Sequence, residues 1–297
     1  MRNAGSFLTL GLRDLNTRPE SMIGYTPDIQ PIRPSVAKSH GWERRREDVL
    51  SFAVTDASCP IVLEEMQLAL VSLPLAFARR KSGEFELVAV TGLYAQENLL
   101  LTEEGSWRTS YVPSWYRGYP FYAGVSTGGD GQDRIALCFD HASGRYREEP
   151  ETAHGEDRFF DAEGSLKPVL SRLTTFFTKR HLSRKRTLAA IKCLAEADLL
   201  QPWEWSFENP VPEKPLRDGF WTVDRVRLRN ISEDVFRDLF ETRALEMAYL
   251  QLASMPQLAV LRQFAMLSAH KSEDQAPDES GQSIDQFFED DEIEFRW

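Results

Sequence analysis

The hydrophobic pattern divides the chain into a β-rich first half and a helical second half. The first half contains short apolar runs bounded by turn residues, which is typical of strands. From about residue 165 onward, apolar residues recur every three or four positions, which is the spacing of amphipathic helices. We therefore expect an α+β fold with an antiparallel, β-rich N-terminal half, one early helix, and a helical C-terminal half packed against it.

The early helix is expected over residues 60–71. Pro60 suits a first helical position, Ser58 lies close enough to help cap it, and two glutamates follow in the early turns. Residues 75–79 and 84–91 flank a polar turn and predict a hairpin. Two further strands are expected, at residues 98–102 and 134–140. A Gly/Asp-rich loop precedes the second of them.

The helical half is expected to contain five helices, at residues 166–181, 183–200, 232–239, 244–252 and 256–266. Ser232 is the expected N-cap of the third helix, with two acids in the first turn behind it. The junction between the first two helices contains the strongest basic cluster of the chain, made of Lys179, Arg180, His181, Arg184, Lys185 and Arg186. This cluster is either a solvated helix junction or a dock for an acidic group.

Charge and composition divide the chain into a loosely ordered arm (1–36), an α+β domain (37–267) and an acidic tail (268–297). The formal charge is −11, and residues 271–297 contain ten acids and two bases, which leaves only −3 for the rest. This near balance gives no support for nucleic-acid binding as the main task, so we expect no nucleic-acid partner. No apolar run is long enough for a membrane span, and no secretory signal is visible, so we expect a cytoplasmic protein with three reduced cysteines.

The search for catalytic chemistry gives no constellation. The five histidines are scattered, and the chain contains no HExxH, CxxC or phosphate-loop motif. Asp140 and His141 are adjacent, but neighbouring residues of a strand point to opposite faces, which favours a structural or surface pair. The sequence therefore predicts neither a cofactor nor a metal, and it favours a protein that is not an enzyme.

The densest aromatic run of the chain lies between residues 107 and 122. Two interpretations are open: a packed core, with residues 115–119 on a short helix beginning near Pro113, or a ledge around an arginine that binds a peptide, an aromatic group or a sugar. The candidate binding residues are Trp107, Tyr111, Trp115, Tyr116, Arg117 and Tyr119.

The end of the acidic tail contains apolar anchors that a purely solvating tail does not need: Phe287, Phe288, Phe295 and Trp297. We expect these side chains to dock on a basic, apolar surface, either around Arg184, Lys185 and Arg186 of this chain or on a partner protein. The alternative is a disordered tail that only increases solubility.

Residues 59–267 resemble the SapC family of bacterial proteins, which is named for a surface-array (S-layer) associated member. Early landmarks are the Pro60-Ile61-Val62 and Pro74-Leu75-Ala76-Phe77 segments, the Thr91-Gly92-Leu93 turn and the Tyr111-Val112-Pro113 turn. Later ones are Arg117-Gly118-Tyr119-Pro120-Phe121, Leu137-Cys138-Phe139-Asp140, Gln201-Pro202-Trp203 and the segment at residues 219–224. Each landmark alone is turn or core chemistry, but together they are specific.

The resemblance implies a part of an uptake or surface system, because relatives tend to be encoded near TonB-dependent receptors and tryptophan-halogenase-like flavoproteins. It implies no catalytic residues. We therefore expect a non-catalytic binding or accessory protein that recognises a peptide, a small molecule or a partner protein. The alternatives are an S-layer or envelope component, and an enzyme whose site is assembled from dispersed residues.

Overall fold

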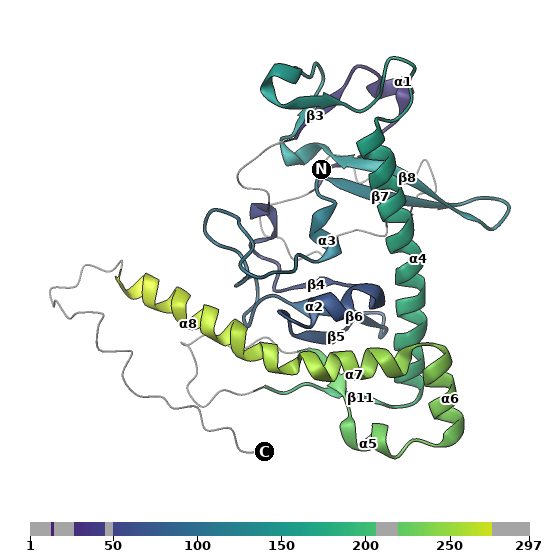
Figure 1. Cartoon of the computed structure of the whole chain (residues 1–297), viewed down its shortest axis with the longest axis vertical. Coiled ribbons are helices and arrows are strands. Elements are labelled where there is room, and N and C mark those ends of the chain that lie inside the picture. Colours follow the sequence, from purple (N-terminus) through teal and green to yellow (C-terminus); the bar gives the residue numbers. More distant parts are fainter. Residues whose placement is uncertain (1–12, 15–26, 45–49, 206–218, 275–297) are drawn as a thin grey trace.

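The computed structural model describes residues 13–14, 27–44, 50–205 and 219–274, and it confirms the α+β class. Strands are concentrated before Pro168 and helices after it, as Figure 1 shows. All strand pairs are antiparallel among the described residues. The strands form three sheets, and one long helix, α4 (Pro168–Glu196), runs beside them.

The largest sheet has five strands in the order β11-β12-β5-β6-β4. Its centre is the expected hairpin of β5 and β6, in which Leu75 pairs with Ala89 and Arg79 with Phe85. The strands are β4 (Ser58–Pro60), β5 (Leu75–Arg79), β6 (Phe85–Val90), β11 (Leu200–Pro202) and β12 (Phe220–Val223). The side chains of Leu75, Ala76 and Phe77 are all buried, because the main hydrophobic core surrounds this sheet.

The other two sheets hold a second hydrophobic core around Trp42, Phe139 and Phe159. One sheet has the order β1-β7-β8-β2 and the other β10-β3-β9. Their strands are β1 (Arg13–Asp14), β2 (Ile29–Pro31), β3 (Gly41–Glu43), β7 (Phe121–Thr127), β8 (Asp133–Asp140), β9 (Tyr146–Arg147) and β10 (Glu156–Arg158). The Gly/Asp-rich loop is the turn between β7 and β8, as expected.

Helix α4 connects the two cores. At about 1.5 Å per residue, its 29 residues span roughly 43 Å. Leu170 and Phe177 in its first half belong to the second core, whereas Ile191 and Leu194 in its last half belong to the main core. Figure 1 shows α4 passing from the β7–β8 hairpin down to the C-terminal helices.

The remaining helices are short, apart from the C-terminal ones. Their bounds are α1 (Pro34–Ala37), α2 (Met66–Ala69), α3 (Ser114–Arg117), α5 (Arg225–Arg229), α6 (Glu233–Glu241), α7 (Ala244–Ser254) and α8 (Leu258–Asp274). Single 3₁₀ turns are η1 (Ser51–Ala53), η2 (Leu63–Glu65), η3 (His141–Ser143), η4 (Thr152–His154) and η5 (Met255–Gln257). Ser232 caps α6 by accepting from the Val235 amide, as expected.

Two of the expected helices are in fact one. The sequence suggested a junction near residue 182, but α4 continues through it without a break. No glycine or proline lies there to end the helix, and the Arg and Lys side chains that mark the cluster are good helix formers. The basic cluster therefore lies along the middle of one helix, where each side chain has a fixed direction.

Three smaller expectations are also corrected. Residue 60 does not begin a helix: Pro60 ends β4 at the sheet edge, where a missing N–H costs nothing, and helical turns begin only at Leu63. Residues 98–102 form a turn with one isolated bridge, Leu101 to Trp107, and no strand. The arm is partly regular, because β2 pairs with β8 and buries Ile29.

Candidate functional site

The aromatic run separates into core residues and cavity residues. Trp115 and Tyr116 on α3 are buried in the main core. Trp107 is half-buried, and its indole N–H donates to the Tyr111 carbonyl at 2.8 Å. Tyr119 is half-buried and stacks on Phe52 with ring centroids 3.7 Å apart. Trp115 and Tyr116 thus fit the packed-core interpretation, whereas Tyr111 and Arg117 are the two of the six that line the cavity described next, and binding there stays a prediction.

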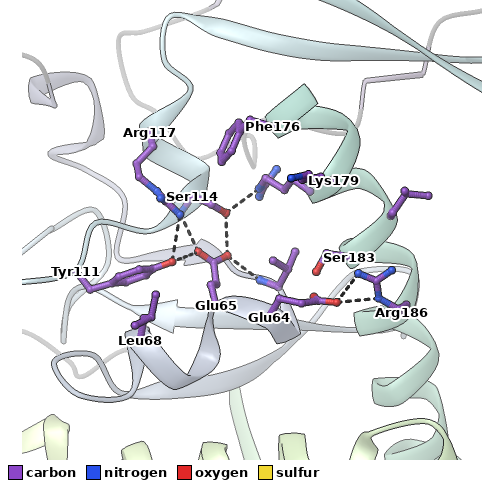
Figure 2. Close-up of a pocket in the computed structure, with 13 residues that line it drawn as sticks. Glu64, Glu65, Leu68, Tyr111, Ser114, Arg117, Phe176, Lys179, Ser183 and Arg186 are labelled. Carbon is purple, nitrogen blue, oxygen red and sulfur yellow. Dashed lines mark hydrogen bonds and ion pairs between the residues drawn. The ribbon is translucent and has the colours of Figure 1, made fainter. Parts of the chain in front are cut away.

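This cavity has a volume of about 530 Å³ and lies between η2, α2, α3 and α4 (Figure 2). Its size is in the range of small-molecule sites. Apolar side chains line part of it, notably Leu68 of α2 and Phe176 and Leu182 of α4. Charged side chains line the rest, and Figure 2 shows Arg117 and Lys179 on one side and Glu64 and Glu65 opposite them.

The carboxylate of Glu65 forms the floor of the cavity and accepts four hydrogen bonds. Its Oε1 accepts from the Val62 amide at 2.8 Å and from the Ser114 hydroxyl at 2.9 Å. Its Oε2 accepts from the Tyr111 hydroxyl at 2.6 Å and from the Ser114 amide at 2.9 Å. A carboxylate has about four acceptor positions, so Glu65 has none left for a substrate proton. It ties residues 62–65 to residues 111–114 and is a poor general base.

Arg180 lies behind this floor and carries a buried positive charge. Its Nε donates to the Ser114 hydroxyl at 3.0 Å, and that hydroxyl in turn donates to Glu65. Its guanidinium also lies over the Trp115 ring, 5.1 Å from the centroid. Burial lowers the pKa of Arg180 to about 10, against the opposing attraction of Glu65, so the group stays charged at neutral pH.

Burial also changes the pKa values of two side chains near the Glu65 carboxylate, Tyr111 and Cys59. Burial, followed by the negative charge of Glu65, raises the pKa of the Tyr111 hydroxyl. The same two causes raise the pKa of the Cys59 thiol well above its usual value. Both groups therefore stay protonated at neutral pH, and Cys59 is not an activated nucleophile.

Two cationic side chains at the rim of the cavity, Arg117 and Lys179, form no ion pair with any carboxylate of the described residues. Arg117 is exposed, and its guanidinium lies 5.6 Å from the Tyr111 ring centroid and 5.7 Å from that of Phe176, while one of its N–H groups donates to the Tyr111 hydroxyl. Lys179 is exposed and has no carboxylate within 4 Å among the described residues. Arg186 differs, since its guanidinium is held by Glu64 through two hydrogen bonds.

The other expected docking residues already have acidic partners in this chain. Arg184 pairs with Glu86 at 2.7 Å, and Lys185 pairs with Asp133. Hydrogen bonds from Lys185 and then from His181 hold the pKa of the Asp133 carboxyl well below its usual range. These pairs connect α4 to β6 and β8. The aromatic anchors of the tail, at residues 287, 288, 295 and 297, lie outside the described residues.

Three polar residues of the site were missed by the sequence reasoning, Glu65, Ser114 and Ser183, and Arg180 was included only as a member of the basic cluster. Glu65 was interpreted only as part of a helix start. A signal did exist for Arg180, because it falls three residues after Phe177 on the apolar stripe of α4, where a charge needs a partner. Ser114 and Ser183 carry no comparable signal.

The contacts of Asp140 and His141 are with backbone amides and an aromatic ring, which is typical of structural residues. Asp140 is buried, and its carboxylate accepts from the Asp28 amide at 2.9 Å and from the Ala142 amide at 3.1 Å. The His141 ring stacks on Tyr146 at 3.8 Å between centroids. Within the described part of the chain, no three His, Cys, Asp or Glu side chains gather in a way that could hold a metal ion. No described helix is long and apolar enough to cross a bilayer.

Comparison of the sequence with models of known protein families gives a match that covers most of the described fold. A family model described as SapC matches residues 37–261, which is more than half of the chain. The chain belongs to the SapC family. All residues of the cavity lie inside this SapC span, whereas residues 275–297 lie beyond it. The searches of curated proteins and of solved structures give no match.

Proposed function

We propose that this SapC protein is a non-catalytic binding protein, and that the cavity between α2, α3 and α4 is its recognition site. The observation that carries the proposal is the contrast between the floor and the rim. The floor is fixed by four hydrogen bonds to Glu65 and has no acceptor left for acid–base work. The rim offers cations that no carboxylate of the described residues pairs, together with exposed apolar side chains, and both suit binding.

Membership of the SapC family supports an accessory role in an uptake or surface system, which the resemblance implied. The ligand in that role is a small molecule, a peptide or a segment of a partner protein. We place the protein in the cytoplasm, and cell fractionation tests this location: recovery at the cell surface would instead favour an envelope component. The saturated Glu65 carboxylate gives no support to the enzyme alternative.

Ligand capture tests the recognition site. The full chain is incubated with a small-molecule extract of its own cells, separated by gel filtration and denatured, and the released molecules are identified by mass spectrometry. Leu68→Glu places a carboxylate at the rim, and because the Leu68 side chain is 62% exposed, we expect the fold to tolerate the change. Val71→Glu is the matched control, since Val71 is equally exposed (62%) but does not line the cavity.

We expect the wild-type chain and Val71→Glu to retain the same molecule, and Leu68→Glu to lose it. Retention by all three proteins, or by none, would contradict a recognition site in this cavity.

For the acidic tail, the proposal is that Phe287, Phe288, Phe295 and Trp297 dock on a partner protein. The pairing of Arg184, Lys185 and Arg186 with acids of this chain supports a partner surface over an internal dock. Deleting residues 283–297 should then abolish partner binding and leave amide hydrogen exchange in α4 unchanged. Faster exchange around Arg184 in the deleted chain would point to the internal dock.

A further inference from the structure

The lining of the cavity has an excess of positive charge. Four cationic side chains line it, Arg117, Lys179, Arg180 and Arg186, against two carboxylates, Glu64 and Glu65. Glu65 is saturated by its four donors, and Glu64 is occupied by Arg186. Each of the two carboxylates thus has protein donors around it, and the lining keeps a net positive charge that attracts an entering anion.

Arg117 and Lys179 are the two cations available to such an anion. Arg117 is held in place by two aromatic rings and by the Tyr111 hydroxyl, so little freedom is lost when it binds. A planar guanidinium presents five N–H donors, and one contact to Tyr111 leaves most of them for a carboxylate. Lys179, on the next turn of α4 after Phe176, adds a second charge on the same side of the cavity (Figure 2).

An unused hydroxyl lies in the wall of the cavity. Ser183 is only 4% exposed, and its Oγ has no hydrogen-bond partner among the described residues. Other hydroxyls of α4 bond back to the carbonyl four residues earlier, as Thr174, Thr178 and Thr187 do at 2.9 Å. Ser183 lines the cavity instead of making this bond (Figure 2). A buried hydroxyl without a partner is costly, which is explained if a ligand supplies the partner.

The apolar part of the lining indicates that the ligand also has an apolar body. Leu68 and Leu182 are large hydrophobic side chains that stay exposed at the rim, and Phe176 lies half-buried between the two cations. A ligand body that covers them removes apolar surface from water, which is the main favourable term of binding.

We infer that the cavity binds a small organic acid, whose carboxylate lies between Arg117 and Lys179, whose apolar body covers Leu68 and Phe176, and whose second polar group bonds to Ser183. This inference rests on the proposed function, because it names the ligand class of the same cavity. The volume of about 530 Å³ accommodates a molecule of the size of an acylated amino acid.

A charged and a neutral probe of the same shape test the inference. N-acetylphenylalanine carries a carboxylate, a phenyl ring and an amide carbonyl, and in N-acetylphenylalaninamide a neutral carboxamide of nearly the same shape replaces the carboxylate. Both are titrated calorimetrically into the full chain. We expect the acid to bind at least about tenfold more tightly than the amide, since a charge-assisted hydrogen bond is lost with the neutral probe.

Variants locate the two contacts. Lys179→Gln should weaken binding of the acid by about tenfold and leave binding of the amide unchanged. Arg172→Gln, which removes one positive charge from an exposed position of the same helix outside the cavity, should change neither. Ser183→Ala should weaken both probes yet leave the melting temperature no lower, because the hydroxyl has no partner in the unliganded fold.

Three results would overturn the inference: equal affinity for acid and amide, an equal effect of the two charge variants, or unchanged binding by Ser183→Ala. Absence of binding by both probes, together with capture of an uncharged molecule from the cell extract, would refute the organic acid and keep the proposed function. Absence of binding and of capture would refute both.

Discussion

Replacing Glu65 by glutamine tests whether its carboxylate organises the site. Glutamine keeps the size of the side chain but exchanges one acceptor oxygen for an NH₂ group. Each oxygen of Glu65 now accepts from one hydroxyl, which can rotate, and from one backbone amide, of Val62 or Ser114, which cannot. Whichever oxygen is replaced, one buried amide faces another donor.

The cost follows from two contributions. A buried donor without an acceptor costs about 1–3 kcal/mol. The charge of Arg180, which is only 8% exposed, also loses the carboxylate that stabilises it most strongly. Breaking a buried charge arrangement typically costs about 3–5 kcal/mol. The two contributions come from the same lost carboxylate and overlap, so they are not summed, and we expect Glu65→Gln to lower the free energy of unfolding by roughly 3–5 kcal/mol.

The neighbouring residue provides the control. Glu64→Gln makes the same chemical change one position earlier, in a partly exposed ion pair with Arg186, which is worth at most about 1 kcal/mol. Urea unfolding followed by far-ultraviolet circular dichroism measures both variants. If Glu65→Gln destabilises the protein no more than Glu64→Gln does, the role assigned to the carboxylate is wrong.

Three further predictions concern other parts of the fold. Gly92→Ala should prevent stable folding, because a Cβ there would lie 1.9 Å from the Glu97 carbonyl oxygen, whereas Gly129→Ala meets nothing within 4 Å; soluble yield and melting temperature compare the two. The pKa of Asp133 is lowered in the folded state, so its pairing stabilises the protein above the unfolded value of about 3.9 and is lost as the pH falls below it. The stability advantage of the wild type over Asp133→Asn should therefore shrink between about pH 5 and pH 2 in urea titrations, and a constant difference would refute the pairing. In the native protein, Cys193 should react first with a thiol reagent, because the other two cysteines are buried; fast labelling of all three would contradict the described core.

The hydrophobic pattern was sufficient to predict the elements in which apolar residues recur at a regular spacing. The β5–β6 hairpin and helices α6 and α7 follow from spacing, turn residues and the Ser232 cap, which act over a few residues. The break expected near residue 182 was wrong because a basic cluster resembles an exposed junction in a sequence. In the fold its members face acids of β6 and β8, which sequence spacing does not reveal.

The site is harder to predict for the same reason. Glu65, Ser114 and Arg180 are 49 and 66 positions apart, and their relation depends on how α4 packs against α3. From the sequence alone, Glu65 cannot be distinguished from any other glutamate in the first turn of a helix. Tyr111 and Arg117 could be selected in advance because they belong to a dense aromatic run, and the cavity brings just these two together with the Glu65 floor.

A crystal structure of the full chain, isolated from its own cells with the molecule that it retains, tests the central claim most directly. The account predicts electron density for a ligand between Arg117, Lys179 and Ser183, above an unchanged Glu65 floor. Density for the retained molecule elsewhere on the protein, with only solvent in this cavity, would contradict it.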